Sequence, residues 1–381
     1  MSVESITLGC RLNFAESETM KRLAPSCDWV IVNSCAVTSE AVRQSRQEIR
    51  RAHRRRPNAR ILVTGCAAEL DRASFEAMPE VDRVLGNGEK LDGMTSVPAG
   101  FQGHVRSFVA IQTGCDHRCT FCSIWQARGP SRSYPFDAVR DAVAREIDRG
   151  AAEIVLTGVD ITDYAGGLGA LCQRLLTAEP RLKRLRLSSL DSIEIDGALL
   201  ELIAGEARVM PHFHLSLQAG DDMVLKRMKR RHSRAQAIGT VERIKGLRAD
   251  ATIGADLIVG FPTETEEMAL NSLRFISDCD IIAAHVFPFS PRPDTPAARM
   301  PQLPRDVVKA RASRLREAAA ERRTAWLNGL VGTAQNVLIE NGGKGHSDSF
   351  APVTIPGAVR GEVGMARIVR RDGNQLVGAW A

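Results

Sequence analysis

The sequence GCDHRCTFC, at residues 114–122, places three cysteines close together in the pattern C-x-x-x-C-x-x-C. It follows an apolar run, residues 107–112, that has the composition of a buried strand. Thiolates this close in sequence can converge on one metal centre, and iron–sulfur clusters are held by cysteine thiolates. Three protein ligands (Cys115, Cys119 and Cys122) would leave one iron of a four-iron cluster open for chemistry, as in catalytic zinc sites. A zinc site completed by a distant ligand is the alternative, although structural zinc motifs prefer paired C-x-x-C units.

Residues 104–326 alternate strand and helix patterns around this loop. Apolar runs are separated by helical patterns such as 136–150 and 265–278. Six such repeats predict an incomplete, open (β/α)6 barrel whose site lies at the carboxyl ends of the strands. The expected strands are 107–112, 152–159, 183–189, 212–217, 251–260 and 280–289.

Residues 1–90 show the same alternation on a smaller scale, which predicts a small parallel sheet covered by helices. Three cysteines each come directly after a predicted strand: Cys10, Cys35 and Cys66. Because the ends of neighbouring parallel strands lie ~4.8 Å apart on one edge, these cysteines would meet there. Small residues before them, such as Gly9 and Gly65, suit tight turns. The alternative is that they only pack, the role predicted for the other cysteines: Cys27, Cys172 and Cys279.

The remaining segments differ in character from these two units. Residues 86–103 are rich in glycine and proline and predict a linker. Residues 328–381 contain short strand patterns separated by turn residues, which predicts a small β-barrel. No run of eighteen apolar residues and no secretory signal is visible, so we expect a cytoplasmic protein with reduced thiols and no membrane partner.

Positive charge is concentrated in residues 39–60, where eight arginines stand against two glutamates and account for the net charge of +6. Such a block predicts an anion-binding surface, with nucleic acid as the first candidate and a solvated helix face as the alternative. Four of its arginines share one helical stripe: Arg43, Arg46, Arg50 and Arg54. A second basic cluster, 226–234, adds Arg230 and Arg231 as candidates for contact with RNA phosphates.

With Phe121 before the last cysteine, the loop resembles that of the radical S-adenosylmethionine enzymes. That resemblance implies a cluster whose open iron binds S-adenosylmethionine and a 5′-deoxyadenosyl radical as the reactive species. The whole chain, with its second triad and β-barrel tail, resembles the methylthiotransferases. The segments that carry this likeness include LGCRLNFAESE (8–18), VNSCAVT (32–38), VTGCAAE (63–69), DLIVGFPTETEE (256–267) and FPFSPRPDTPAARM (287–300).

The resemblance implies two [4Fe–4S] clusters and S-adenosylmethionine as cofactors. It implies a tRNA substrate, a low-potential electron donor and a sulfur donor as partners, and a TRAM-like, RNA-binding role for the tail. The second cluster would carry the sulfur that is inserted at C2 of an adenine and then methylated. Polar acid–base catalysis gains only ~10²–10⁴-fold, too little to break this aromatic C–H bond, so a radical cofactor suits the task.

Within the family, the start LGCRLNFAESE looks most like enzymes that act on N6-threonylcarbamoyladenosine at tRNA position 37. Enzymes for isopentenyladenosine tend to start Tyr-Gly-Cys-Gln-Met-Asn, and those for a ribosomal protein aspartate Gly-Cys-Pro-Lys-Asn; both substrates remain alternatives. A non-catalytic iron–sulfur protein that binds RNA or transfers electrons is a third, although electron carriers usually close each cluster with four protein ligands. The chain departs from the family pattern at Trp125 and Thr263.

Further candidates for binding S-adenosylmethionine lie just after predicted strands. Gly158 and Gly260 would allow close approach of a cofactor, with a simple turn as the alternative. Asp160 and Glu194 offer carboxylates near the same strand ends, where a surface carboxylate is the alternative. Two arginines that follow the cysteine loop are candidates for contact with substrate or cofactor: Arg128 and Arg132.

Overall fold

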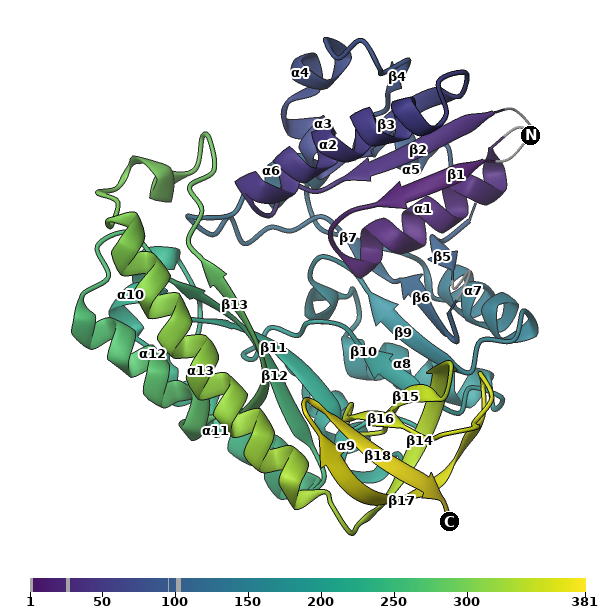
Figure 1. The fold of residues 1–381 in the computed structure, drawn as a ribbon, viewed down its shortest axis with the longest axis vertical. Helices are drawn as coiled ribbons and strands as arrows, with labels where there is room; N and C mark the ends of the chain where they lie inside the picture. Colours follow the sequence, from purple (N-terminus) through teal and green to yellow (C-terminus); the bar gives the residue numbers. More distant parts are fainter. Residues whose placement is uncertain (1–2, 25–27, 95, 101–103) are drawn as a thin grey trace.

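Four parallel strands form a sheet at the amino end of the chain, in the order β1-β2-β3-β4 (Figure 1). The computed structural model describes residues 3–24, 28–94, 96–100 and 104–381. The central strands β2 and β3 are almost wholly buried because helices cover the sheet. The elements are β1 (Glu4–Thr7), α1 (Arg11–Leu23), β2 (Trp29–Ser34), α2 (Ser39–Arg55), β3 (Arg60–Gly65), α3 (Cys66–Leu70), α4 (Arg72–Glu76), β4 (Arg83–Val84) and α5 (Asn87–Asp92).

The segment predicted as a linker is partly ordered secondary structure, so that prediction is wrong for residues 87–92, which form α5. Asn87 Nδ2 donates to the Ala127 carbonyl at 2.7 Å. Lys90 Nζ lies 2.5 Å from a carboxylate oxygen of Glu16 on α1. These buried contacts hold α5 in place although its glycine-rich sequence has a low helix propensity. A buried polar group left without a partner would cost free energy, so the contacts favour the conformation in which the groups are paired.

Six parallel strands form the incomplete barrel that the sequence predicts. Strands β10, β9 and β6 make one sheet with the antiparallel edge strand β5, and β11, β12 and β13 make another. Single parallel bridges, Leu185–Val209 and Leu190–Leu215, join the two sheets. The elements are β5 (Ala99–Gly100), β6 (Arg106–Ala110), β7 (Gln112–Thr113), α6 (Ile124–Arg128), β8 (Arg132–Ser133), α7 (Phe136–Asp148), β9 (Glu153–Thr157), α8 (Leu168–Ala178), β10 (Leu185–Leu187), α9 (Gly197–Gly205), β11 (His212–Gln218), α10 (Asp222–Met228), α11 (Arg234–Leu247), β12 (Thr252–Val259), α12 (Glu266–Asp278), β13 (Ile281–Pro288) and α13 (Arg305–Gly329).

The carboxyl-terminal strands close into a small barrel, in the order β14-β15-β16-β18-β17, which confirms the predicted β-barrel tail. Its strands are β14 (Ala334–Asn341), β15 (Lys344–Ser347), β16 (Pro352–Thr354), β17 (Val363–Asp372) and β18 (Gln375–Trp380). Phe350 stacks on His212 at the amino end of β11, with ring centroids 5.1 Å apart. The small barrel therefore docks on the end of the large barrel that is remote from the cysteine loop.

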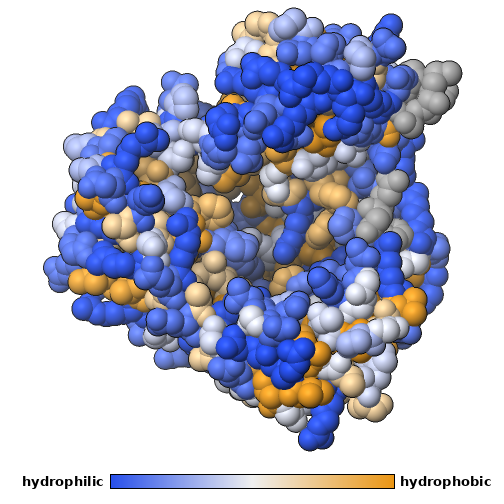
Figure 2. Space-filling model, in the orientation of Figure 1, coloured by the Kyte–Doolittle hydropathy of each residue, from blue (hydrophilic) through white to orange (hydrophobic). Residues whose placement is uncertain are grey.

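The three units surround a hollow at the centre of the molecule, visible in the space-filling view (Figure 2). The amino end of α1 and the strands of the open barrel border this region in the ribbon view (Figure 1). In the described part of the chain, no helix has the length and apolar character needed to cross a membrane.

Candidate functional site

The cysteine loop follows β6, and the short β7–β8 hairpin closes its base through the pairs Gln112–Ser133 and Thr113–Arg132. Backbone hydrogen bonds then fix the loop: Cys115 N–H donates to the Gly129 carbonyl and Cys122 N–H to the Cys119 carbonyl, both at 3.1 Å. The three cysteines are thus presented together at the carboxyl ends of the barrel strands, where such folds keep their chemistry.

Burial favours the neutral form of two thiols of this loop, while Arg230 Nη1 lies 3.8 Å from Sγ of the third, Cys119. Burial raises the pKa of Cys115 to about 12 and that of Cys122 to about 11, and the neighbouring cysteines add to both shifts. Metal binding requires thiolates, so the metal itself must supply the compensating positive charge. Buried thiols with raised pKa values suit the role of metal ligands better than that of a free nucleophilic cysteine.

The second triad assembles at one edge of the amino-terminal sheet. Cys10 precedes α1, Cys35 follows β2, and Cys66 is the first residue of α3. Gly9 has φ +97°, and a Cβ there would lie 2.7 Å from Cys35 Sγ, so only glycine permits this approach. Gly65 is equally constrained, because its Cβ would lie 2.3 Å from the Ser34 carbonyl oxygen.

The three thiols share a buried environment. Burial, followed by the nearby Cys66 and Cys10, raises the pKa of Cys35 to about 11. Burial also raises the pKa of Cys10, which Cys66 and Arg128 influence as well. The remaining described cysteines, Cys172 and Cys279, are buried in the core of the large barrel, as predicted, and Cys27 lies outside the described residues.

Each triad offers cysteine sulfurs alone as ligands. Within the described residues, the sets of three possible ligands that lie within 4.8 Å of one another include neither triad. A tetrahedral zinc ion, with bonds of ~2.3 Å to sulfur, would draw its ligands closer together than this. The two all-cysteine donor sets therefore suit iron–sulfur clusters, each with three protein ligands.

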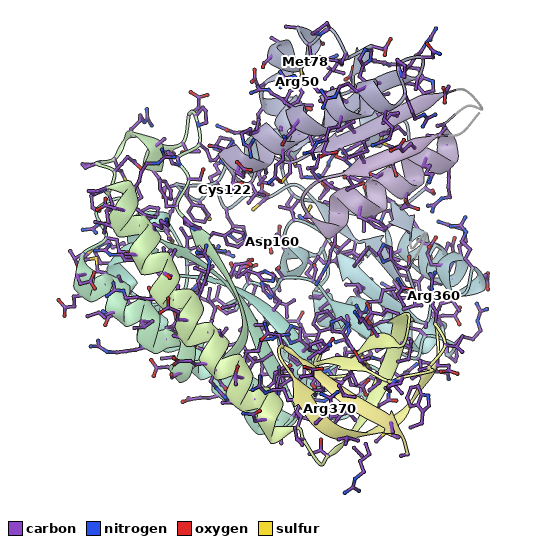
Figure 3. The ribbon with its side chains drawn as sticks, in the orientation of Figure 1. Arg50, Met78, Cys122, Asp160, Arg360 and Arg370 are labelled. Carbon is purple, nitrogen blue, oxygen red and sulfur yellow. The ribbon has the colours of Figure 1, made fainter. Side chains whose placement is uncertain are left out.

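Arg128, at the end of α6, links the two triads. Its Nε donates to Cys66 Sγ at 3.3 Å, and its Nη2 donates at 2.6 Å to Oδ1 of Asn13, which also contacts Cys10 Sγ at 3.8 Å. Helix α6 begins two residues after Cys122, so one short helix connects the cysteine loop to the second triad. Figure 3 shows Cys122 beside the central hollow, where Asp160 also lies.

A fully buried ion network holds Arg128 in this position. Glu16 accepts from Arg128 at 2.7 Å and lies 2.5 Å from Lys90 Nζ, and all three side chains are at most 1% exposed. Burial alone would raise the pKa of Glu16, but the two cations hold it at about 2. Two cations against one carboxylate leave a net positive charge beside Cys66.

Asp160 and Glu194, predicted from their strand-end positions, belong to one polar cluster next to the cysteine loop. Asp160 Oδ2 lies 2.5 Å from His117 Nε2, and Cys115 Sγ lies within 4.8 Å of the ligand atoms of both. Thr162 donates to Asp160 at 2.8 Å and to Glu194 at 3.1 Å. The hydrogen bond to Asp160 raises the pKa of His117, so the pair offers a charged donor and an acceptor to a ligand beside the loop.

The two predicted glycines and Phe121 have packing roles in the structure. A Cβ at Gly158 would meet Gln112, whose Oε1 accepts from the backbone N–H groups of Val159 and Asp160. A Cβ at Gly260 would lie 2.7 Å from Val308 on α13. Phe121 packs against a small buried cluster that includes Met228 and Phe261.

The α2 stripe of arginines is only partly available to a ligand. Arg43, Arg50 and Arg54 are exposed, on a surface that Figure 2 shows as hydrophilic. Arg46 instead joins α2 to α4, since it lies 2.8 Å from Asp71 and 2.7 Å from Ser74 Oγ. Of the stripe, Arg46 is therefore the member least suited to binding RNA.

The side chain of Arg230, predicted as an RNA contact, is only 8% exposed and is held by protein groups. Its guanidinium bonds to Asp191 at 3.0 Å and to the Ser216 carbonyl at 2.8 Å, and it lies 3.8 Å from Cys119 Sγ. Its neighbour Arg231 is half-exposed and lies 2.5 Å from Glu194. Both lie next to the cysteine loop, because Thr120 of that loop donates its N–H to the carbonyl of Met228, the last residue of α10.

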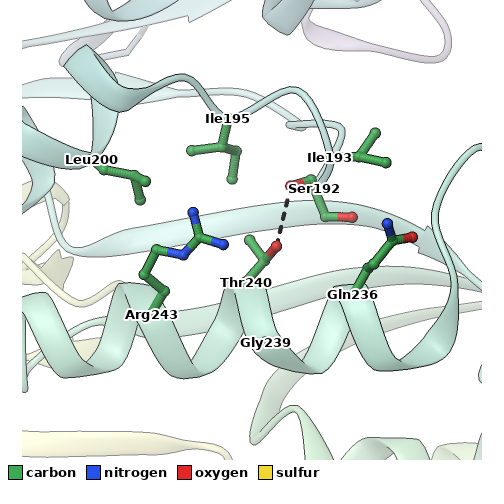
Figure 4. A pocket seen from close by; sticks show the side chains of 8 residues that line it. All are labelled: Ser192, Ile193, Ile195, Leu200, Gln236, Gly239, Thr240 and Arg243. Carbon is green, nitrogen blue, oxygen red and sulfur yellow. Dashed lines mark hydrogen bonds between the residues drawn. The ribbon is translucent and has the colours of Figure 1, made fainter.

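A pocket of about 230 Å³ lies apart from both triads, between residues 192–195 and α11 (Figure 4). Thr240 Oγ1 donates to the Ser192 carbonyl across it at 3.3 Å, and Arg243 is its charged lining residue. It contains no cysteine and lies behind the cluster formed by Asp160 and Glu194.

Several residues of the site were not singled out by sequence reasoning. His117 lies inside the quoted loop, and Asn13 and Glu16 lie inside LGCRLNFAESE, so the signal was position within a motif. Lys90 gave no signal, because it lies in the glycine-rich stretch that reads as a linker.

Comparisons with known proteins identify two sequence families. The Radical SAM superfamily matches residues 109–276, and the Uncharacterized protein family UPF0004 matches residues 2–86. The "Threonylcarbamoyladenosine tRNA methylthiotransferase MtaB" of Rickettsia prowazekii is 42% identical, over 92% of this chain and 91% of the relative. The "tRNA-2-methylthio-N(6)-dimethylallyladenosine synthase" of Erythrobacter litoralis is 30% identical, over 98% and 95%.

Among solved structures, the radical S-adenosylmethionine methyltransferase TsrM from Kitasatospora setae superposes with a TM-score of 0.55 at 16% identity. The match covers 76% of this chain and 69% of TsrM, and it supports the barrel fold. The chain is an enzyme, and it belongs to the radical S-adenosylmethionine methylthiotransferase family.

Proposed function

We propose that this enzyme adds a methylthio group to C2 of N6-threonylcarbamoyladenosine at position 37 of tRNA, giving the 2-methylthio derivative. The observation that carries the proposal is the pair of cysteine triads joined by α6, in a chain 42% identical to a relative named for this modification. A single cluster site would serve radical chemistry but would leave the added sulfur without a place to bind.

The enzyme uses two [4Fe–4S] clusters and S-adenosylmethionine. In the proposal, the 115–122 loop holds the cluster that binds S-adenosylmethionine, and Cys10, Cys35 and Cys66 hold the cluster that carries sulfur. When bound, S-adenosylmethionine supplies the carbon radical and the methyl group, a chemistry that no side chain provides. The protein's task is to hold, orient and shield these groups.

The chain's own cations act on the thiolates of both sites. Arg230 lies beside Cys119 and Arg128 beside Cys66. Hydrogen bonds to cluster sulfurs stabilise the more negative state and raise the reduction potential. We therefore expect these two arginines to set the potentials of the two clusters and to fix the orientation of their cysteine ligands.

The proposal divides the work among three parts of the chain: residues 104–326 for the radical chemistry, 1–90 for sulfur and 328–381 for RNA. Exposed arginines of α2, Arg43, Arg50 and Arg54, would bind tRNA phosphates together with the carboxyl-terminal barrel. A low-potential electron donor and a sulfur donor complete the reaction, and a tRNA substrate would be met in the cytoplasm.

Mass spectrometry of tRNA nucleosides from cells that lack this protein tests the proposal. We expect 2-methylthio-N6-threonylcarbamoyladenosine to disappear and its unmethylthiolated precursor to accumulate. Return of the wild-type gene should restore the product, whereas a Cys35→Ala gene should not. Loss of 2-methylthio-isopentenyladenosine instead, the modification in the name of the Erythrobacter relative, would overturn the substrate assignment.

A further inference from the structure

Arg11 is the first residue of α1 and directly follows Cys10 of the second triad. Its side chain is exposed to solvent. The guanidinium lies 6.0 Å from the Phe108 ring on β6, so the side chain extends from the amino-terminal sheet toward the strands of the open barrel. The amino end of α1 points toward the middle of the molecule in Figure 1, where Figure 2 shows the hollow.

The guanidinium of Arg11 has no hydrogen-bond or ion-pair partner among the residues that the structure describes; its recorded contact is the Phe108 ring, 6.0 Å away. The acids nearby are already engaged. Asp256 accepts from His214 at 3.0 Å and from His285 at 3.1 Å, and Glu153 is shared by three other arginines. The five N–H donors of the Arg11 guanidinium are thus free to bind an anion.

The surroundings of Arg11 favour a negatively charged ligand. Desolvation lowers the pKa of His212, whose ring stacks on Phe350, and positive charges that include those of Arg186, Arg11 and Arg323 contribute to the shift. Arg323, on α13, also has no recorded ion-pair partner among the described residues, and burial lowers its pKa. Phe108 adds an apolar face beside Arg11.

We propose that Arg11 binds the free carboxylate of the threonylcarbamoyl arm of the substrate. This inference rests on the proposed function. The arm leaves the purine at N6, while the reacting carbon is C2 of the same ring. A cation next to a sulfur-site cysteine can therefore hold the arm while C2 faces the second triad. An isopentenyl arm has no charge and would leave Arg11 unpaired.

Binding of two nucleosides to the reconstituted holoenzyme tests the inference without turnover. The probes are N6-threonylcarbamoyladenosine and its carboxamide, which have the same shape but differ in the charge of the arm, because an NH2 group replaces one carboxylate oxygen. We expect the wild-type enzyme to bind the carboxylate form about 10- to 100-fold more tightly, the usual worth of a charge-assisted bond. Equal affinity for the two nucleosides would overturn the assignment, and this comparison needs no variant.

Three variants then assign the effect to one side chain. Arg11→Gln should bind both nucleosides equally, while Arg11→Lys, which keeps the charge but loses the planar fork, should keep part of the preference. Arg323→Gln removes a nearby charge and should keep most of it. A preference that survives Arg11→Gln, or that disappears in Arg323→Gln alone, would contradict the role of Arg11.

Turnover separates this inference from the proposed function. If the wild-type enzyme methylthiolates tRNA carrying isopentenyladenosine and not tRNA carrying threonylcarbamoyladenosine, the proposed function fails. If it modifies the latter while Arg11→Gln leaves KM and kcat unchanged, only the role of Arg11 fails. A KM for the tRNA that rises at least about tenfold in Arg11→Gln supports both.

Discussion

The two cysteine triads are built in different ways. Cys115, Cys119 and Cys122 lie on one loop, whose shape is set by short-range backbone hydrogen bonds and by the hairpin at its base. Cys10, Cys35 and Cys66 come from three separate loops and meet because β1, β2 and β3 align in one sheet. The second triad also depends on the buried contacts of Arg128. The first site is therefore a local structure, and the second is a tertiary one that should be easier to disrupt.

The largest expected effects separate the roles of the two triads. Cys119→Ala should abolish reductive cleavage of S-adenosylmethionine, because the cluster that binds it loses a ligand. Cys35→Ala should leave this cleavage in place but stop methylthiolation. Cleavage is measured as 5′-deoxyadenosine, and product by mass spectrometry of the tRNA. A Cys35→Ala enzyme that still forms product would remove the sulfur role from the second triad.

Removing Arg128 should damage the second triad and spare the first. Arg128→Met takes a buried donor from Cys66 and a cation from Glu16, and breaking a buried pair in this way costs about 3–5 kcal/mol. We expect loss of about half of the bound iron, with S-adenosylmethionine cleavage retained. The matched control is Arg140→Met, because Arg140 is an exposed arginine paired with Asp137 and Asp141. Equal iron content in the two variants would show that Arg128 is not needed by the second triad.

Lowering the pH should weaken the buried ion network that holds Arg128 beside the second triad, because it protonates Glu16. Its folded pKa of about 2 lies below the unfolded value of ~4.3, so the stability it contributes is complete above that value and is lost as pH falls toward 2. Glu153, held at about 2 by arginines despite its burial, adds a similar loss where the carboxyl-terminal barrel docks. Glu16 and Glu153 each contribute about 3 kcal/mol to the free energy of unfolding at neutral pH.

Denaturant unfolding at a series of pH values measures this dependence. Glu16→Gln should be less stable at neutral pH and should lose less stability between pH ~4.3 and 2 than the wild type. An unchanged slope in this variant would mean that folding does not lower the pKa of Glu16.

The smallest expected effect concerns RNA binding. Reversal of Arg50 and Arg54 to glutamate should weaken tRNA binding and flatten its salt dependence, since about two phosphate contacts are lost. Arg46→Glu is not a clean control, because Arg46 joins α2 to α4. Arg140→Glu on α7 serves instead and should leave binding unchanged. Binding that is the same in the double variant and the wild type would make α2 a solvated face.

Much of the fold could be predicted from the sequence, because each barrel strand is an apolar run bounded by turns. The strand-end positions of Cys10, Cys35 and Cys66 could be predicted for the same reason. The contacts of Arg128 could not, because its partners on α1 and α3 lie far away in the sequence. Helix α5 was missed because it is stabilised by buried tertiary contacts rather than by its composition.

Thr263 shows a departure from the family pattern that the structure explains in part. The residue has φ +65°, a conformation that glycine adopts without strain and a β-branched residue rarely adopts. The family preference for glycine at this position follows from that backbone geometry. No contact in the described residues explains why threonine is tolerated here beyond the bond from Arg227 to its carbonyl oxygen, at 3.1 Å.

The iron content of the anaerobically reconstituted enzyme, measured with its Mössbauer spectrum, tests the central claim most directly. Two clusters with three cysteine ligands each predict about eight irons per chain, all in [4Fe–4S] form. About four irons per chain in the wild-type enzyme would contradict the account, because one of the triads would then hold no cluster.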